Sequence, residues 1–115
     1  MKDNRVYLRE ILERIRRIEM ATKDGHKVFM ESTLIQDAVT RNFGVIGEAG
    51  KGISSELRDN HPDVPWQQIA CFRDILIHDY MSIIVEELWK TAESDLPTLK
   101  KRIAEILESL ESNES

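Results

Sequence analysis

The sequence has few of the residues that interrupt helices or cross-link chains. It contains one cysteine, three prolines and five glycines in 115 residues, so an intramolecular disulfide is excluded and long loops are not expected. No apolar run approaches the roughly 18 residues of a membrane-spanning helix, and no secretory hydrophobic segment is found. These absences predict a soluble cytoplasmic protein. The single Cys71 is expected to be a small core residue rather than a nucleophile.

Leucine, isoleucine, glutamate, lysine and arginine are plentiful, which favours an all-α protein. The chain is predicted to be one domain, 1–115, with about 111–115 as a frayed tail. Its net charge of −5 counts against general nucleic-acid binding, which depends on an excess of Lys and Arg. Basic residues do cluster locally, in patches compatible with a narrow RNA cleft: Arg14, Arg16 and Arg17, and later Lys100, Lys101 and Arg102.

Apolar residues recur at steps of three and four and predict four main helices plus a short fifth. The helices are expected over about 4–23 and 32–58, from Pro65 towards Tyr80, briefly after Tyr80, and from a restart at 94–97. The inward residues predicted for the second helix are Leu34, Ile35, Ala38, Val39, Ile46, Ala49, Ile53 and Leu57. Together these segments predict an all-α up-and-down bundle.

The second predicted helix carries Gly44, Gly47 and Gly50 at steps of three. Each glycine costs roughly 1 kcal/mol against alanine in a helix interior. A smooth face for close helix approach is the preferred explanation. A phosphate-binding loop is rejected, because Val45 stands where a Walker motif needs glycine and Gly52 where it needs serine or threonine.

The segment 73–80, Arg-Asp-Ile-Leu-Ile-His-Asp-Tyr, places polar groups in an otherwise apolar, strongly helical stretch. Arg73 is a permanent cation that can hold phosphate in a fork of N–H donors. His78 suits proton transfer near neutral pH, and Tyr80 adds a hydroxyl. A cation, a proton shuttle and a hydroxyl are the groups that phosphodiester cleavage without a metal requires.

Five residues separate Arg73 from His78, which places them about 140° apart around a straight helix. Either the helix ends or distorts near His78, or the side chains reach round a groove, or two copies of the segment face each other across a two-fold axis. We favour the two-fold arrangement, because it also uses the apolar surplus of the segment. The protein is therefore predicted to be a homodimer whose interface includes Trp66–Tyr80.

If spacing alone is considered, Arg73, His78 and Tyr80 could equally have structural roles rather than catalytic ones. Arg73 could pair with Glu48 or Asp74 on the helix surface, His78 could be a helix C-terminal residue favoured by the macrodipole, and Tyr80 could be a core or rim residue. No pair of histidines has the spacing of metal ligands, so no metal site is predicted.

Arg73, His78 and Tyr80 form the pattern Arg-x4-His-x-Tyr, and with it the chain resembles the HEPN ribonucleases, in the form carried by the HepT toxins of bacterial toxin–antitoxin pairs. Further stretches resemble the same family and follow in order along the chain: Gly44–Lys51, Val64–Ile69 and Asp95–Leu99. HepT proteins often carry Asn after the motif Arg and Gly after the motif His, whereas this chain has aspartate at both positions.

The resemblance implies a homodimeric, HEPN-like helical domain with its cleft at the dimer interface. It also implies metal-independent endoribonuclease activity without a cofactor, in which the 2′-OH of RNA attacks the adjacent phosphate. His78 would then transfer protons, and Arg73 would stabilise charge on the transition state. Asp74 is expected to support the site by orienting Arg73 or His78.

The resemblance further implies a partner, a small MntA-like nucleotidyltransferase antitoxin that transfers AMP from ATP to Tyr80. A bulky anionic nucleotide beside Arg73 and His78 would exclude the RNA phosphate. Two alternatives stay open at this point. The chain could be a noncatalytic helical HEPN module that binds a nucleotidyltransferase, or a pure dimerisation domain, which would leave these three polar residues unexplained.

Overall fold

The fold comes from a computed structural model that describes residues 3–72 and 81–112, and the side chains of all of these except 81–84. The described residues form helices and no strand, so the predicted all-α class is confirmed. In chain order the helices are α1 (Asn4–Ala21), α2 (His26–Glu31), α3 (Thr33–Gly52), α4 (Ser55–Asn60), α5 (Trp66–Cys71), α7 (Met81–Lys90), the π-helix η1 (Thr91–Asp95) and α8 (Leu96–Ser112).

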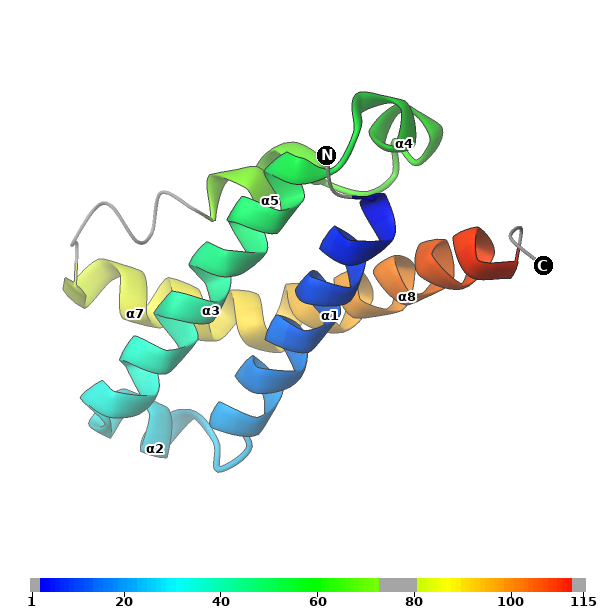
Figure 1. Ribbon diagram of the computed structural model, residues 1–115. Helices are drawn as coiled ribbons and strands as arrows, with labels where there is room; N and C mark the ends of the chain where they lie inside the picture. The colour runs from blue at the N-terminus through cyan, green and yellow to red at the C-terminus, as the bar shows by residue number, and fades with distance from the viewer. Residues whose placement is uncertain (1–2, 73–80, 113–115) are drawn as a thin grey trace.

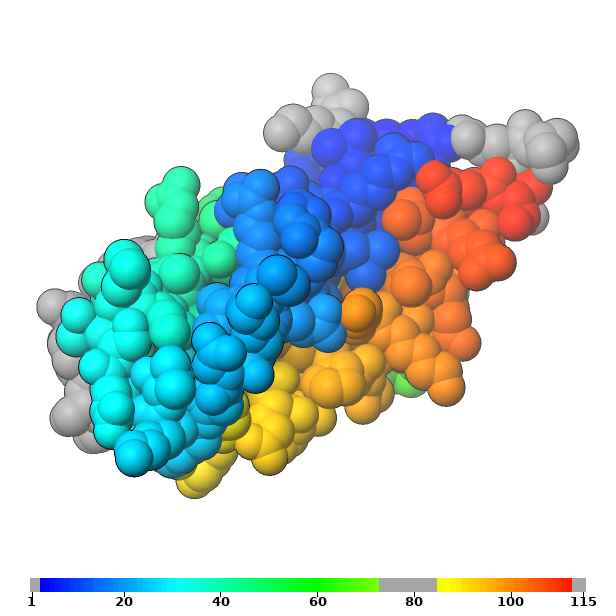
Figure 2. All heavy atoms as spheres, turned by 90° about the horizontal axis from the view of Figure 1, so that it is seen from below, coloured from blue at the N-terminus to red at the C-terminus, as the bar shows by residue number. Residues whose placement is uncertain are grey.

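Two long helices, α1 and α3, lie side by side and antiparallel, and α7, η1 and α8 cross them as one rod (Figure 1). Seen from below, the blue side chains of α1 lie between the cyan beginning of α3 and the orange part of α8 (Figure 2). The short helix α5 packs against α3. α3 thus contacts α1, α2, α5 and α7, and α1 contacts α3 and α8.

One apolar core fills the space between α1, α3 and the rod. The residues of α1 that point into it, Leu8, Ile11, Ile15 and Ile18, are all 0% exposed. They follow the predicted three- and four-residue spacing, because that spacing keeps side chains on one face of a helix. The buried residues that meet them are Val39, Phe43 and Ile46 of α3, and Leu96, Leu99, Ile103 and Ile106 of α8.

A buried polar group links α1 to α3. The Asn42 side chain is 8% exposed, and its amide nitrogen donates to the carbonyl of Ala38 at 2.8 Å. Arg14 Nη1 donates to Asn42 Oδ1 at 3.2 Å, and Arg14 Nε donates to Glu10 at 2.9 Å. Because the amide is satisfied on both sides, its burial does not leave an unpaired polar atom.

The inward face of α3 differs from the predicted one over its first turns. Leu34 is 79% exposed and Ala38 is exposed, whereas Val39 is fully buried. Leu34 precedes Val39 by five residues, which places it about 140° away around the helix. The prediction that Leu34 and Ala38 point inward is therefore wrong. The other predicted residues are buried or half-buried: Ile35, Val39, Ile46, Ala49, Ile53 and Leu57.

The helix predicted over 32–58 is broken between α3 and α4. Ile53 is extended, with φ −65° and ψ 135°. Ser54 caps α4, since its hydroxyl accepts from the Leu57 N–H at 3.2 Å. Asn4 fixes this corner from α1, because the Ser54 N–H donates to Asn4 Oδ1 at 2.9 Å and Asn4 Nδ2 donates to Ser54 Oγ at 3.0 Å. A serine side chain that caps a new helix competes with continuation of the old one.

A helix that the sequence did not predict, α2, follows α1. The first helix was expected to reach Lys23, but α1 ends at Ala21. Gly25 then turns the chain at φ +97°, a left-handed conformation that favours glycine. Phe29, at 1% exposure, anchors α2 in the core.

The predicted restart at 94–97 is not a break, because α7, η1 and α8 follow one another without interruption. Pro97 lacks an N–H, and its ring would clash with the carbonyl four residues earlier in a regular α-helix. The preceding turn is wider: the Leu96 N–H donates to the carbonyl of Thr91, five residues back. A π-helical turn thus lets the rod continue past the proline.

A smaller prediction, on Cys71, also needs correction. Cys71 is exposed rather than in the core, because the inward residues of α5 are Trp66 and Ile69 and Cys71 lies about 200° beyond Ile69 around the helix. Of the tail expected from about 111, Glu111 and Ser112 belong to α8, and residues 113–115 lie outside the described residues.

Candidate functional site

The predicted site residues Arg73, Asp74, His78 and Tyr80 lie outside the residues that the structure describes. Their mutual geometry therefore stays a prediction. The structure describes the frame on either side: α5 and Phe72 precede the segment, and α7 follows it (Figure 1). The contacts that fix α5 and α7 therefore fix the two points from which the segment 73–80 starts and ends.

The loop before α5 is fixed to α8 by a bidentate ion pair. Arg102 Nε donates to Asp63 Oδ2 at 2.6 Å and Nη2 to Oδ1 at 3.2 Å, while Nη1 donates to Glu105 at 3.1 Å. These hydrogen bonds lower the pKa of the Asp63 carboxyl and raise the pKa of Arg102. The Trp66 indole N–H donates to the carbonyl of His61 at 2.9 Å. The beginning of α5 is thus tied down at two points.

The body of α5 lies directly against α3 at Gly50. A Cβ added at Gly50 would lie 2.7 Å from Ile69 Cγ2, whereas carbon atoms pack at about 3.5–4.0 Å. Ile69 is 1% exposed, and Gly44 and Gly47 are also buried. The predicted role in close helix approach is therefore confirmed for Gly50.

On the other side of 73–80, α7 is attached to α2. The Trp89 ring lies 5.5 Å from that of Phe29 and 5.2 Å from that of His26, measured between centroids. His26 Nε2 is 3.1 Å from Glu86 Oε2, and Leu88 is buried at 3% exposure. The unpredicted helix α2 is therefore one of the supports of the segment that follows the site.

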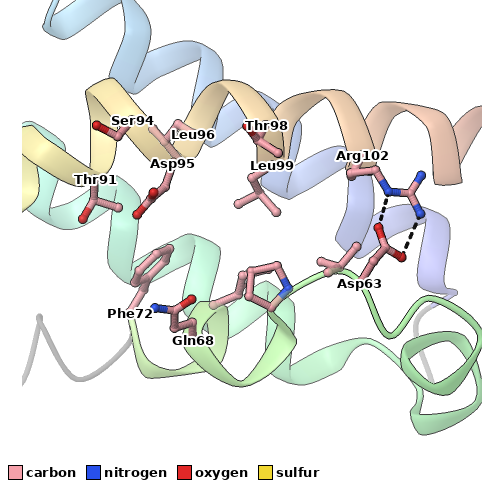
Figure 3. A pocket seen from close by; sticks show the side chains of 13 residues that line it. Asp63, Gln68, Phe72, Thr91, Ser94, Asp95, Leu96, Thr98, Leu99 and Arg102 are labelled. Carbon is pink, nitrogen blue, oxygen red and sulfur yellow. Dashed lines mark hydrogen bonds and ion pairs between the residues drawn. The ribbon is translucent and has the colours of Figure 1, made fainter.

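A pocket of about 490 Å³ lies between α5 and the rod, with Phe72 in its lining (Figure 3). Its apolar lining consists of Val64, Pro65, Ile69, Phe72, Leu96 and Leu99. Its polar lining consists of Gln68, Thr91, Ser94, Asp95 and Thr98, with the Asp63–Arg102 ion pair at one end. The members of this set come from two segments that are well separated along the chain, so the sequence did not predict that they form one pocket.

The stretches that carry the family resemblance meet around this pocket. Val64–Ile69 supplies one wall and Asp95–Leu99 the other, while Gly44–Lys51 backs α5 through the contact at Gly50. Val64–Ile69 includes most of α5 itself, Gly44–Lys51 packs behind that helix, and Asp95–Leu99 faces it across the pocket. That helix leads directly to Phe72 and Arg73.

The basic clusters noted in the sequence are largely neutralised by acids. Arg16 and Arg17 both bind Glu13, at 2.7 and 3.1 Å, and Lys100 binds Glu19 at 3.0 Å. The hydrogen bonds from Arg16 and then Arg17 lower the pKa of Glu13 to about 2. With Arg14 and Arg102 paired as described above, five of the six cations in the two clusters contact acids, and within the described residues Lys101 is the exception. The basic clusters therefore do not support the RNA cleft with which the sequence made them compatible.

Within residues 3–72 and 81–112, no group of three His, Cys, Asp or Glu side chains is placed to hold a metal ion. None of the described helices combines the length and the apolar character that crossing a bilayer would require.

Comparison with known proteins identifies the class. A profile of the HepT-like ribonucleases, described as "Ribonuclease HepT-like", matches residues 10–106, which include 73–80. The chain therefore belongs to the HepT-like ribonuclease family, and the predicted HepT resemblance is confirmed. No solved structure matches the chain significantly.

Several curated proteins are similar over almost the whole chain. A Methanocaldococcus jannaschii protein named "Gamma-glutamylcyclotransferase and putative RNase" is 40% identical in an alignment 115 residues long, which covers 99% of this chain but only 52% of that protein. The "Probable ribonuclease HepT" of Thermococcus cleftensis is 37% identical over 91% of this chain and 96% of its own length. A "Putative RNase" of Caldanaerobacter subterraneus subsp. tengcongensis is 36% identical, with 94% and 97% covered. The chain thus spans about half of the first relative and nearly all of the other two.

Proposed function

We propose that this protein is a metal-independent endoribonuclease that acts as the toxin of a toxin–antitoxin pair. The observation that supports this is the pattern of Arg73, His78 and Tyr80 inside the region matched by the family of HepT-like ribonucleases. The names of the relatives point the same way, since each contains the word RNase or ribonuclease.

In the proposed reaction the 2′-oxygen of a ribose attacks the adjacent phosphorus. The bond from the 2′-oxygen to phosphorus forms, the bond from phosphorus to the 5′-oxygen breaks, and the products are a cyclic 2′,3′-phosphate and a 5′-OH end. His78 transfers the proton, and Arg73 stabilises the added charge on the phosphate oxygens. Asp74 orients one of these two side chains. The need for a 2′-OH restricts the substrate to RNA.

The decisive experiment compares Arg73→Ala and His78→Ala with the unchanged protein in cleavage of labelled RNA. Each substitution is expected to reduce cleavage by about 10²–10⁴-fold and to abolish toxicity in cells. Arg41→Ala is the matched control for Arg73→Ala, because the Arg41 side chain is exposed on α3. Cleavage that survives His78→Ala, or that stops with EDTA, would contradict this mechanism.

The same experiment separates the alternative of a noncatalytic HEPN module. That alternative draws support from Asp74 and Asp79, since two carboxylates beside the motif would repel RNA phosphate unless cations pair with them. A protein that binds a nucleotidyltransferase but cleaves no RNA, with or without His78, would establish the noncatalytic role.

The proposed active form is a homodimer whose interface includes Trp66–Tyr80. Light scattering at micromolar concentration is expected to give twice the chain mass of 13.3 kDa. Cys71 is exposed in one protomer and is the single cysteine, so a short bismaleimide should link the two chains and should fail on Cys71→Ser. A monomer mass at that concentration would contradict the proposal.

The proposed antitoxin is an MntA-like nucleotidyltransferase that modifies Tyr80. The tyrosine oxygen attacks the α-phosphorus of ATP and loses its proton, and pyrophosphate leaves. Co-expression should then add whole AMP units to Tyr80 and abolish cleavage, because the new phosphate occupies Arg73. Tyr80→Phe should prevent the modification, while Tyr7→Phe, at the single other tyrosine, should not. AMP found on Tyr7, or full activity after Tyr80 is modified, would show that the switch is misassigned.

A further inference from the structure

We infer that the pocket between α5 and the rod binds one base of the RNA substrate and selects bases that carry an exocyclic amine over uracil. The inference rests on the proposed ribonuclease function, but its first test does not depend on cleavage. The pocket volume of about 490 Å³ falls within the usual range of about 300–1,000 Å³ for sites that enclose small molecules.

The lining is suited to a flat ring rather than to an anion. Its charged residues are Asp63, Asp95 and Arg102, two acids and one base. Arg102 is already engaged with Asp63 at 2.6 and 3.2 Å and with Glu105 at 3.1 Å. No described lysine or arginine is left in the lining to hold a phosphate, so the pocket favours a neutral group with hydrogen-bond donors.

An aromatic surface is available for stacking. Phe72 lines the pocket and is half-buried, and it is fixed from behind by Phe43, with ring centroids 5.0 Å apart in an edge-to-face arrangement. Single-stranded RNA is commonly bound with its bases unstacked onto aromatic side chains. Loss of one such stack changes affinity by about 5- to 150-fold.

The polar groups opposite and beside this ring can read the edge of a base. Thr91 and Asp95 project from η1 towards Phe72 and Gln68 on the other wall (Figure 3). Asp95 forms no ion pair with any residue in the described parts of the chain, so its carboxylate can accept from an exocyclic amine. The Gln68 amide can donate and accept at once, as glutamine does with adenine. Uracil lacks the amine and offers a single N–H.

The position of the pocket along the chain connects it with the proposed chemistry. Phe72 is followed directly by Arg73, the residue assigned to the phosphate. A base seated against Phe72 is thus held by the residue that directly precedes the proposed phosphate ligand in the chain. The pocket selects the sequence that is cut, and Arg73 and His78 act on the phosphate.

The first test measures nucleoside binding to the isotope-labelled full chain by NMR. Millimolar adenosine and cytidine are expected to shift the Gln68 side-chain amide and the backbone amides of Phe72 and Asp95, and uridine should shift them less. Gln68→Trp fills the pocket and should abolish the response. Glu108→Trp is the matched control, because Glu108 is exposed on α8, lies outside the proposed dimer interface and does not line the pocket. Absent shifts, an equal response to uridine, or shifts that persist in Gln68→Trp would overturn the inference. Stronger binding of inorganic phosphate at the same amides would also overturn it.

The second test measures the cleavage of RNA oligonucleotides that differ at one base. Gln68→Trp and Asp95→Asn should raise KM by about 5- to 150-fold for the preferred base, with kcat less affected, and should flatten the base preference. Glu108→Trp should retain the preference. If the unchanged protein cuts no RNA, the ribonuclease proposal fails, and the nucleoside titration still decides whether the pocket binds a base. If Gln68→Trp removes only the binding of a nucleotidyltransferase partner and leaves the nucleoside response unchanged, the pocket serves a protein and the inference is wrong.

Discussion

Replacement of Gly50 by alanine tests whether the contact between α3 and α5 is as close as the structure has it. The added Cβ would lie 2.7 Å from Ile69 Cγ2, about 1 Å short of ordinary carbon contact. Ile69 is buried and branched at Cβ, so it has little freedom to turn away. Overpacking of this kind costs about 1–3 kcal/mol, and alanine recovers up to about 1 kcal/mol as the better helix former.

The expected net loss of stability is therefore about 1 kcal/mol, which lowers the melting temperature by about 4 °C in a domain of this size. The measurement is denaturant unfolding followed by circular dichroism. Asp37→Ala, an exposed change on the same helix, should stay within about 0.5 kcal/mol of the unchanged protein.

A double-mutant cycle makes the test specific to this contact. Ile69→Ala alone should cost about 3 kcal/mol, as expected for a buried aliphatic side chain. In the double variant the methyl group added at position 50 no longer meets Ile69 Cγ2 and partly fills the space left behind. The two losses should therefore sum to at least about 1 kcal/mol more than the double variant loses. If they add within about 0.5 kcal/mol, the close approach of Gly50 to Ile69 is refuted.

Three further results are expected. Glu13 has a pKa lowered to about 2 by Arg16 and Arg17, so it stabilises the fold above its unfolded pKa of about 4.5 and this contribution is lost as pH falls towards 2. Glu13→Gln should thus reduce the fall of the melting temperature between about pH 4.5 and pH 2. An unchanged fall would contradict the pairing of Glu13 with Arg16 and Arg17. Asp63→Arg and Arg102→Asp should each lower the melting temperature, and the double variant that carries both should recover most of the loss. If the double variant shows no recovery, the ion pair does not hold the loop before α5. Trp89→Ala should lower the free energy of unfolding by about 2 kcal/mol, because the half-buried Trp89 ring joins α7 to α2. Amide hydrogen exchange should rise first in α2, and exchange protection retained in α2 would contradict this attachment.

The long helices and the candidate catalytic residues were within reach of sequence analysis. Ile11 and Ile15 of α1, and Ile103 of α8, belong to apolar patterns with the helical period, and all three are fully buried. Burial of one face of a helix follows from this local periodicity. The motif of Arg73 and His78 is a chemical pattern that needs no fold to be noticed, and the family match covers it. Sequence reasoning also explained Gly50 correctly, since a glycine inside a helix usually marks a close approach.

Other features depend on partners that lie far away along the chain. The break before α4 is fixed by Asn4, 50 residues from Ser54, and the exposure of Leu34 follows from which face of α3 meets α1 and the rod. The cation of Arg102 looked available for RNA, but its Asp63 partner is 39 residues away. No local pattern could reveal these pairings.

The sequence by itself thus determined the helical class, the family and the residues proposed for catalysis, because periodicity and a short motif are local properties. Only the tertiary structure decided which cations are neutralised, where the helices stop, and that a pocket lies beside Phe72. The walls of that pocket, α5 and the rod formed by α7, η1 and α8, are brought together by the burial of an apolar core shared by α1, α3 and α8. The physical reason is that helix packing joins segments that are distant along the chain, and no local sequence pattern specifies that juxtaposition.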